Sequence, residues 1–166
     1  NKAGAKFDPK KLLWVNAQHI QKTNIKDLVR PCSSINTDID KDVFEKLLEI
    51  VRPRLETIDG LKKKFNYLFE RPSVNKDLVS KMSSKETISA INDFIIEVKS
   101  NKTNKAKNLK ELLSKSVERS GAKFGKTLGF CRLSIVGKME GPDVFEMMEF
   151  VGADEALDRL ASCANI

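Results

Sequence analysis

The sequence is poor in the residues that most enzyme chemistry uses. It has one histidine, His19, and three cysteines, none in a Cys-x-x-Cys pair. Hydrolytic and metal sites usually need imidazole as a ligand or proton carrier, and zinc sites or disulfide frameworks need suitably spaced thiols. The composition therefore argues against a hydrolytic enzyme. We assign no catalytic residue, metal ligand or cofactor-binding residue, and we expect the cysteines to be reduced and mostly structural.

Long apolar runs are also missing. A membrane-spanning helix needs about 18 or more apolar residues in succession, and a signal segment needs an apolar core. Residues 1–20 instead carry scattered lysines and Asp8. We expect no membrane partner and a cytoplasmic location, or alternatively the interior of an organelle.

Positive charge is abundant. The formal net charge is +7 and the pI is about 9.3, which favours a polyanionic partner. A lysine- and asparagine-rich chain can also be basic for reasons of composition alone. Both readings stay open at this point, and the lysine run 99–110 is likewise either a solvated loop or a phosphate contact.

Apolar residues recur at helical spacing along the chain. Asp8 and Pro9 form a typical helix start, and residues 40–51 show one apolar face that Pro53 interrupts, which predicts a bend near Arg52. A further helix is expected from Thr57 to Pro72. Helices are also predicted before Gly121, from Pro142 to Gly152 and from Asp154 onward. The fold class is therefore all-α, a two-part helical bundle without a substantial sheet, with subdomains at 1–74 and 75–166.

Two strings imitate nucleotide-binding motifs. Residues 81–85, Lys-Met-Ser-Ser-Lys, resemble an ATP loop of one synthetase class, but the Ser83 to Glu86 stretch is better read as a capping box. Residues 121–127, Gly-Ala-Lys-Phe-Gly-Lys-Thr, have three residues between the glycines where a phosphate-binding loop needs four. Gly121 is expected to end a helix in a left-handed cap.

Three ordered blocks carry a family resemblance. "FDPKKLLWVNAQHI", "VRPRLETI" and "CRLSIVGKMEGPDVFEMMEFVG" resemble the C-terminal anticodon-binding part of bacterial-type glutamyl-tRNA synthetases, also called glutamate–tRNA ligases. The resemblance implies a glutamate-accepting tRNA as partner and an N-terminal catalytic domain in the same polypeptide, which would use ATP and Mg. It implies that this chain alone is not an enzyme and has no cofactor. We expect a monomer.

The resemblance assigns Arg54, with Arg52 beside it, to the tRNA. In the family the second arginine of Arg-Pro-Arg reads the third anticodon base. A guanidinium carries only donors, so it suits the acceptors O2 and N3 of cytosine and opposes the donors of guanine. Glutamate and glutamine anticodons differ at that base, so Arg54 suggests a protein that rejects glutamine tRNA. Without the resemblance, both arginines could simply donate to the last carbonyl groups of a helix and complement the negative end of its dipole.

A second group comes from the third block. The resemblance assigns Arg132, Pro142, Asp143, Val144 and Lys138 to tRNA binding. This sequence has Val136 and Gly141 where the family has other residues, which removes a hydroxyl contact there. In the first block we expect His19 to be half-buried and Trp14 to pack between subdomains.

Two other functions stay open. One is a helical protein-interaction module with no RNA ligand. The other is a nucleotide-dependent enzyme using Lys85 or Lys126, although neither lysine follows a strand.

Overall fold

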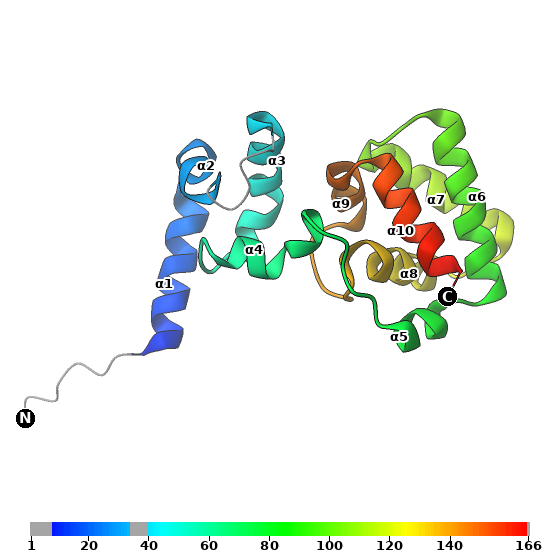
Figure 1. The fold of residues 1–166 in the computed structure, drawn as a ribbon, viewed down its shortest axis with the longest axis horizontal. Coiled ribbons are helices and arrows are strands. Elements are labelled where there is room, and N and C mark those ends of the chain that lie inside the picture. The colour runs from blue at the N-terminus through cyan, green and yellow to red at the C-terminus, as the bar shows by residue number, and fades with distance from the viewer. Residues whose placement is uncertain (1–7, 34–39, 166) are drawn as a thin grey trace, which may run out of the picture. The chain divides into compact units, whose positions relative to one another are not determined.

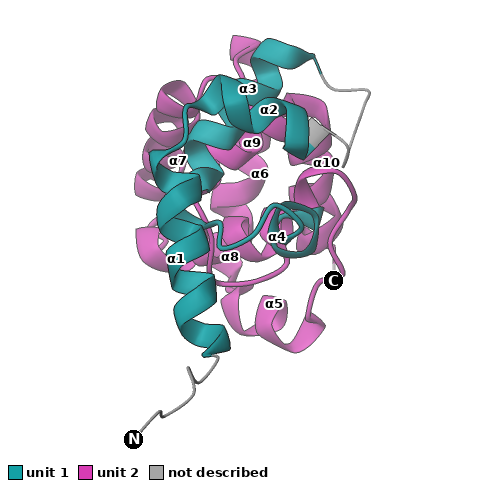
Figure 2. Cartoon of the chain, turned by 90° about the vertical axis from the view of Figure 1, so that its left-hand side faces the viewer, with its two compact units in different colours: residues 1–66 teal, residues 67–166 magenta. Residues whose placement is uncertain are grey.

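The computed structural model describes residues 8–33 and 40–165, and Phe7 of the first block lies outside them. These residues form ten α-helices, two short 3-10 helices and no strand (Figure 1). The predicted all-α class is confirmed. The chain divides into two compact units, which we call unit 1 (residues 1–66) and unit 2 (residues 67–166) (Figure 2). No described helix is long and apolar enough to cross a membrane.

Unit 1 begins with the predicted helix start. Asp8 accepts hydrogen bonds from the amides of Lys10 (2.9 Å) and Lys11 (3.3 Å), and Pro9 stands at the first helical position. Asp40 caps the third helix in the same way. The α-helices of the unit are α1 (Pro9–Lys22), α2 (Ile25–Ser33), α3 (Lys41–Val51) and α4 (Gly60–Lys64). The predicted interruption after α3 is confirmed, because Arg52–Arg54 form the 3-10 helix η1.

The prediction of a single helix from Thr57 to Pro72 is wrong. The structure has only α4, followed by the 3-10 helix η2 (Asn66–Leu68). Phe65 ends α4 with a non-helical backbone (φ −123°, ψ 26°), although Phe65, Tyr67 and Leu68 are all buried. The carbonyl oxygen of Tyr67 accepts a hydrogen bond from Arg159, which lies far away in the sequence, so long-range contacts hold this segment.

Unit 2 is a bundle of longer helices, in which α6 packs against α7, α10 packs against α6 and α8, and α9 packs against α7 and α8. Its helices are α5 (Lys76–Met82), α6 (Lys85–Asn101), α7 (Ala106–Ser120), α8 (Phe124–Val136), α9 (Val144–Val151) and α10 (Ala153–Ala164). Phe94 of α6 and Phe130 of α8 are among its largest fully buried side chains. Burial also raises the pKa of the Cys131 thiol to about 12, which fits a structural cysteine.

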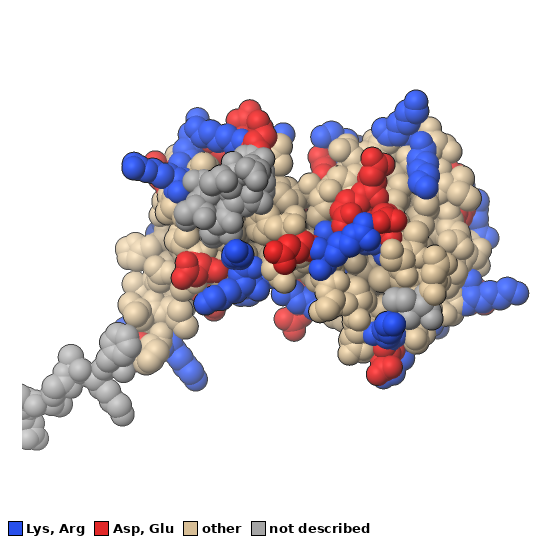
Figure 3. All heavy atoms as spheres, in the orientation of Figure 1, with Lys and Arg blue, Asp and Glu red and all other residues tan. Residues whose placement is uncertain are grey.

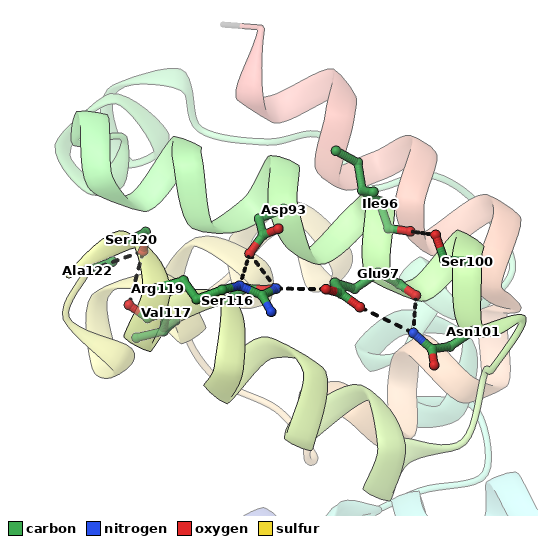
Figure 4. A network of polar contacts seen from close by, with 10 residues as sticks. All are labelled: Asp93, Ile96, Glu97, Ser100, Asn101, Ser116, Val117, Arg119, Ser120 and Ala122. Atoms are coloured by element: carbon green, nitrogen blue, oxygen red, sulfur yellow. Dashed lines mark hydrogen bonds and ion pairs between the residues drawn. The ribbon is translucent and has the colours of Figure 1, made fainter.

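Charged side chains join α6 to α7 outside the core. Arg119 donates from Nε to Asp93 Oδ2 (2.8 Å) and from Nη2 to Glu97 Oε1 (3.0 Å), as Figure 4 shows. Asp93 and Glu97 lie one turn apart on α6, so a single guanidinium can meet both carboxylates. The network links the two helices on the outside of the bundle.

The two nucleotide-like strings are parts of helices. Ser84, rather than Ser83, is the N-cap of α6, and its Oγ accepts from the amide of Thr87 (3.3 Å). The expected cap therefore lies one residue further along, because Ser83 instead donates its hydroxyl to the carbonyl of Val79 at the end of α5. Gly121 ends α7 with a φ of 70°, as predicted, and Phe124 begins α8. Neither string follows a strand in the part of the chain that the structure describes.

The division between the units falls upstream of the expected boundary after residue 74. The segment that contains Tyr67 and Arg71 is tied to α10. The buried Arg159 donates to the carbonyl oxygen of Tyr67 (2.8 Å), and Arg71 pairs with Glu155 (2.8 Å) and also with Asp158. These contacts between residues distant in sequence place the segment in unit 2.

Candidate nucleic-acid interface

The Arg-Pro-Arg turn (residues 52–54) is an exposed feature of unit 1. Pro53 lacks an amide donor and α3 ends at Val51, so the backbone turns through η1. Its carbonyls are held by side chains of neighbouring helices. Gln21 Nε2 donates to Pro53 O (3.3 Å), and Lys64 Nζ donates to Arg54 O (3.0 Å). The turn is therefore held in place before any ligand binds.

The two arginines of this turn have different surroundings. Arg52 is half-buried, and its Nη1 donates to the carbonyl oxygen of Thr23 (3.1 Å). Arg54 is exposed, and the described residues give its guanidinium no hydrogen bond or ion pair. Arg54 can therefore offer all its donors to a ligand, whereas Arg52 already joins η1 to the end of α1. RNA contact by either residue stays a prediction.

The α8–α9 loop (residues 137–143) is the corresponding feature of unit 2. Arg132 on α8 donates from Nη1 to the carbonyl oxygen of Pro142 (2.7 Å). Gly141 has a φ of 148°, which disfavours a side chain, and a Cβ there would lie 3.6 Å from the hydroxyl of Tyr67 and 3.7 Å from Arg132 Nη1. Arg132 therefore fixes the path of the loop into α9.

The residues after Gly141 begin α9. Asp143 is its N-cap and accepts from the amides of Phe145 (2.8 Å) and Glu146 (3.3 Å). The helix thus starts at Val144, two residues after the expected start at Pro142, because the Asp143 carboxylate satisfies its first amides. Pro142 is buried and Val144 is 1% exposed, so these two side chains support the loop from within. Their contact with tRNA stays a prediction.

Lys138 adds a cation to the loop. It is exposed, and its Nζ lies 5.7 Å from the centroid of the Tyr67 ring, within reach of a cation–π interaction. Sequence reasoning missed Tyr67, because its place beneath the loop depends on contacts between residues far apart in the chain. It also expected His19 to be half-buried, and this expectation is wrong, because His19 is exposed while α1 buries Ala17 and Ile20. Trp14 is 63% exposed within the described residues, and its packing between subdomains stays a prediction.

The structure brings the predicted residues of the third block together within unit 2 and places Arg52 and Arg54 on unit 1 (Figure 2). Lysine and arginine side chains are spread over the face of each unit that Figure 3 shows. The described residues contain no group of three or more His, Cys, Asp or Glu side chains that could hold a metal ion. What the two surfaces offer is a set of donor-only cations on preformed backbone turns, which is the chemistry of nucleic-acid recognition.

An all-helical body with such surfaces is compatible with the class of nucleic-acid-binding domains. The family follows from comparison with known proteins. The chain belongs to the anticodon binding domain family, because the model of that family matches residues 18–164. The match includes both the Arg-Pro-Arg turn and the α8–α9 loop.

Similar proteins are glutamate–tRNA ligases. The chain is 26% identical over 164 residues to that of Flavobacterium johnsoniae, covering 96% of this chain and 33% of the relative. It is 30% identical to glutamate–tRNA ligase 1 of Fervidobacterium nodosum, with the same coverage. A crystal structure of a glutamate tRNA ligase from Elizabethkingia meningosepticum in complex with its amino acid superposes with a TM-score of 0.88 at 25% identity, covering 99% of this chain and 34% of that chain. This chain thus spans about one third of the length of each of these three proteins.

Proposed function

We propose that this chain is the anticodon-recognition part of a glutamate–tRNA ligase and that it binds glutamate tRNA. The single observation that carries the proposal is the family match, which runs through both candidate surfaces. The names of the relatives, which are glutamate–tRNA ligases, indicate glutamate as the amino acid in this proposal. The chain itself performs no chemistry in this proposal, since it only positions the tRNA.

Arg54 supplies the discrimination at the third anticodon base. Its guanidinium is exposed and the backbone of its turn is held at Arg54 O and Pro53 O, so the donors can approach an unstacked base without reordering the chain. Cytosine offers acceptors to these donors, whereas guanine presents its own donors and would leave them unpaired. A matched base contact of this kind is worth about 1–3 kcal/mol, by analogy with bidentate base readout.

The α8–α9 loop supplies a second contact. Lys138 offers a charge for phosphate, and Arg132, already bonded to Pro142 O, holds the loop in shape. Asp143 is a positioning residue, because its carboxylate caps α9. Pro142 and Val144 shape the loop from beneath.

The rest of the protein is also part of the proposal. Because the chain covers one third of its relatives, we infer a catalytic domain in the same polypeptide that uses ATP and Mg to charge the tRNA. We also propose that the parent acts in the cytoplasm, or alternatively in the interior of an organelle, and that it is a monomer.

The test compares two RNAs and two variants. Anisotropy measurements use glutamate tRNA and the same tRNA with guanine at the third anticodon position. Wild type should bind the natural tRNA about tenfold more tightly, as one good base contact predicts. The ratio of the two affinities should fall to near one in Arg54→Gln. Lys62→Gln, which removes a charge from an exposed position of the same unit, should keep it. Equal affinity of wild type for both RNAs contradicts the proposed discrimination.

One observation favours an additional protein contact. Leu12, Leu13 and Trp14 at the start of α1 are 54%, 42% and 63% exposed. Adjacent exposed apolar side chains are typical of surfaces that another protein covers. The inferred catalytic domain is our candidate. Added in trans, the separately expressed catalytic domain of a relative should bind wild type more tightly than a Leu12→Ser/Trp14→Ser variant, and equal binding contradicts this contact.

A further inference from the structure

We propose that unit 2 carries a phosphate-binding site at the α6–α7 turn (residues 102–105), separate from the α8–α9 loop, and that it holds the backbone of the bound RNA. An open cavity of about 520 Å³ lies between this turn and the start of α10. Its polar lining comes from Lys99, Lys102, Thr103, Asn104 and Asp154. We call it the lysine cavity.

Positive charge predominates in the chain segment that forms the lysine cavity, although Asp154 also belongs to the lining. Residues 99–110 contain lysines at 99, 102, 105, 107 and 110 and no acidic residue. Lys105 is engaged, since its Nζ pairs with Glu149 Oε1 (2.9 Å). The described residues provide no hydrogen bond or ion pair to the ammonium groups of Lys99 and Lys102. Two cations that line one cavity without partners favour an anionic ligand.

The backbone at Lys102 gives a second and independent observation. Lys102 ends α6 in the left-handed conformation, with φ 47° and ψ 42°, and it is the one non-glycine residue with positive φ in the part of the chain that the structure describes. Helices α7 and α8 end in the same conformation on Gly121 and Gly137. Glycine adopts this conformation without strain, whereas lysine does not. A lysine therefore stands in a strained cap, where glycine would be more stable, and this same lysine lines the lysine cavity.

The turn is also held in shape from outside. Glu149 on α9 accepts from the amide of Ala106 (2.8 Å) as well as from Lys105, so it caps an α7 helix that has no N-cap side chain of its own. Asn108 donates to the hydroxyl of Thr103 (2.9 Å). These bonds keep the backbone of the turn ordered, so a ligand would not have to organise it.

The charge balance identifies the kind of phosphate. Asp154 also lines the lysine cavity, so two ammonium groups and one carboxylate leave one positive charge. This matches the single negative charge of a phosphodiester better than the several charges of a nucleoside triphosphate. RNA as the source rests on the proposed function, whereas the anion site itself does not. In the orientation of Figure 1, Figure 3 shows blue side chains projecting at the edge of unit 2 where the α6–α7 turn lies.

The decisive variant is Lys102→Gly, because the proposal predicts opposite changes in stability and binding. Glycine removes the strain of the left-handed cap, so the melting temperature should rise. Loss of one phosphate contact should reduce the slope of log Kobs against log salt by about 0.7–0.9 for glutamate tRNA. Lys99→Gln, which leaves the backbone unchanged, should reduce the slope by a similar amount. Lys76→Gln on α5 removes an equal charge from an exposed position and should leave the slope unchanged.

A second measurement separates the sources of phosphate. Backbone amide NMR signals of residues 102–104 should shift on titration with inorganic phosphate and with glutamate tRNA, and the shifts should be lost in Lys102→Gly. If Lys102→Gly is more stable but the slope of log Kobs against log salt is unchanged, Lys102 is only a strained helix cap. That result would overturn the proposal. Shifts with inorganic phosphate but not with tRNA would overturn RNA as the partner. If only the anticodon assignment fails, discrimination at the third base is absent while the slope still depends on Lys102.

Discussion

Nη1 of Arg132 lies 2.7 Å from the carbonyl oxygen of Pro142, so the arginine of the third block shapes the loop before any RNA arrives. Replacing it with methionine removes both the charge and this hydrogen bond. A bond from a charged donor is worth about 1.5–3 kcal/mol, so Arg132→Met should lower the free energy of unfolding by an amount of this order. It should also weaken binding of glutamate tRNA, as measured by anisotropy.

Arg132→Lys separates the two effects. It keeps the positive charge but has a single donor group on a flexible stem, so it cannot reproduce the planar fork. If binding depends on the shape of the loop, Arg132→Lys should resemble Arg132→Met. If Arg132→Lys binds tRNA as well as wild type, the positioning role is wrong and only charge matters.

Arg159 is the buried arginine of unit 2, at 5% exposure. It donates to the carbonyl oxygens of Tyr67 and Ile135, both at 2.8 Å, and to Glu155. Arg159→Met would leave these buried carbonyls without a donor, which should cost about 3–5 kcal/mol in urea denaturation. Arg119→Met, which breaks the exposed network of Figure 4, should cost much less. Similar losses for both variants would contradict the importance given to burial.

Acid should weaken unit 2 through Glu155. Hydrogen bonding to Arg71, and then to Arg159, holds the pKa of the Glu155 carboxyl below its ordinary value, against an opposing effect of burial. A lowered folded-state pKa stabilises the fold fully above the unfolded pKa of about 4.3, and this contribution is lost as the pH falls through the folded value. Wild type should therefore be more stable than Glu155→Gln at pH 7, and the difference should shrink below about pH 4. A constant difference across this range of thermal melts would contradict the linkage.

Gly137 and Gly121 form a matched pair for a backbone test. Both have positive φ, at 77° and 70°. A Cβ at Gly137 would lie 2.7 Å from Pro72 Cβ, whereas a Cβ at Gly121 meets nothing within 4 Å. Gly121→Ala should cost about 1–2 kcal/mol for conformation alone. Gly137→Ala should cost more, because the contact with Pro72 must also yield. Chemical denaturation measures both, and equal costs would show that Pro72 moves freely.

The predictions that succeeded rest on short-range chemistry. Asp8 with Pro9, the bend at Arg52 and the cap at Gly121 follow from side-chain and backbone preferences within a few residues. Two boundaries missed by one or two residues, the cap at Ser84 and the start of α9 at Val144, also have local causes. The helix expected from Thr57 to Pro72 is different, because its second half is held by a contact distant in sequence, that of Arg159 with Tyr67 O.

The candidate interface divides in the same way. Its arginines could be named from the sequence because the three blocks keep their residues in a recognisable order. The different contacts of these arginines could not be predicted from the sequence. Arg52 and Arg54 are two positions apart, yet one bonds to Thr23 and the other is exposed.

The sequence by itself determined an all-helical fold, helix ends set by local capping, and membership in a tRNA-binding family, because these depend on residue type and spacing. Only the tertiary structure decided that Tyr67 lies beneath Lys138, that Glu149 caps α7, and that Lys99 and Lys102 line one cavity. The physical reason is that each of these contacts joins distant residues or separate helices, and they meet only when the helices pack.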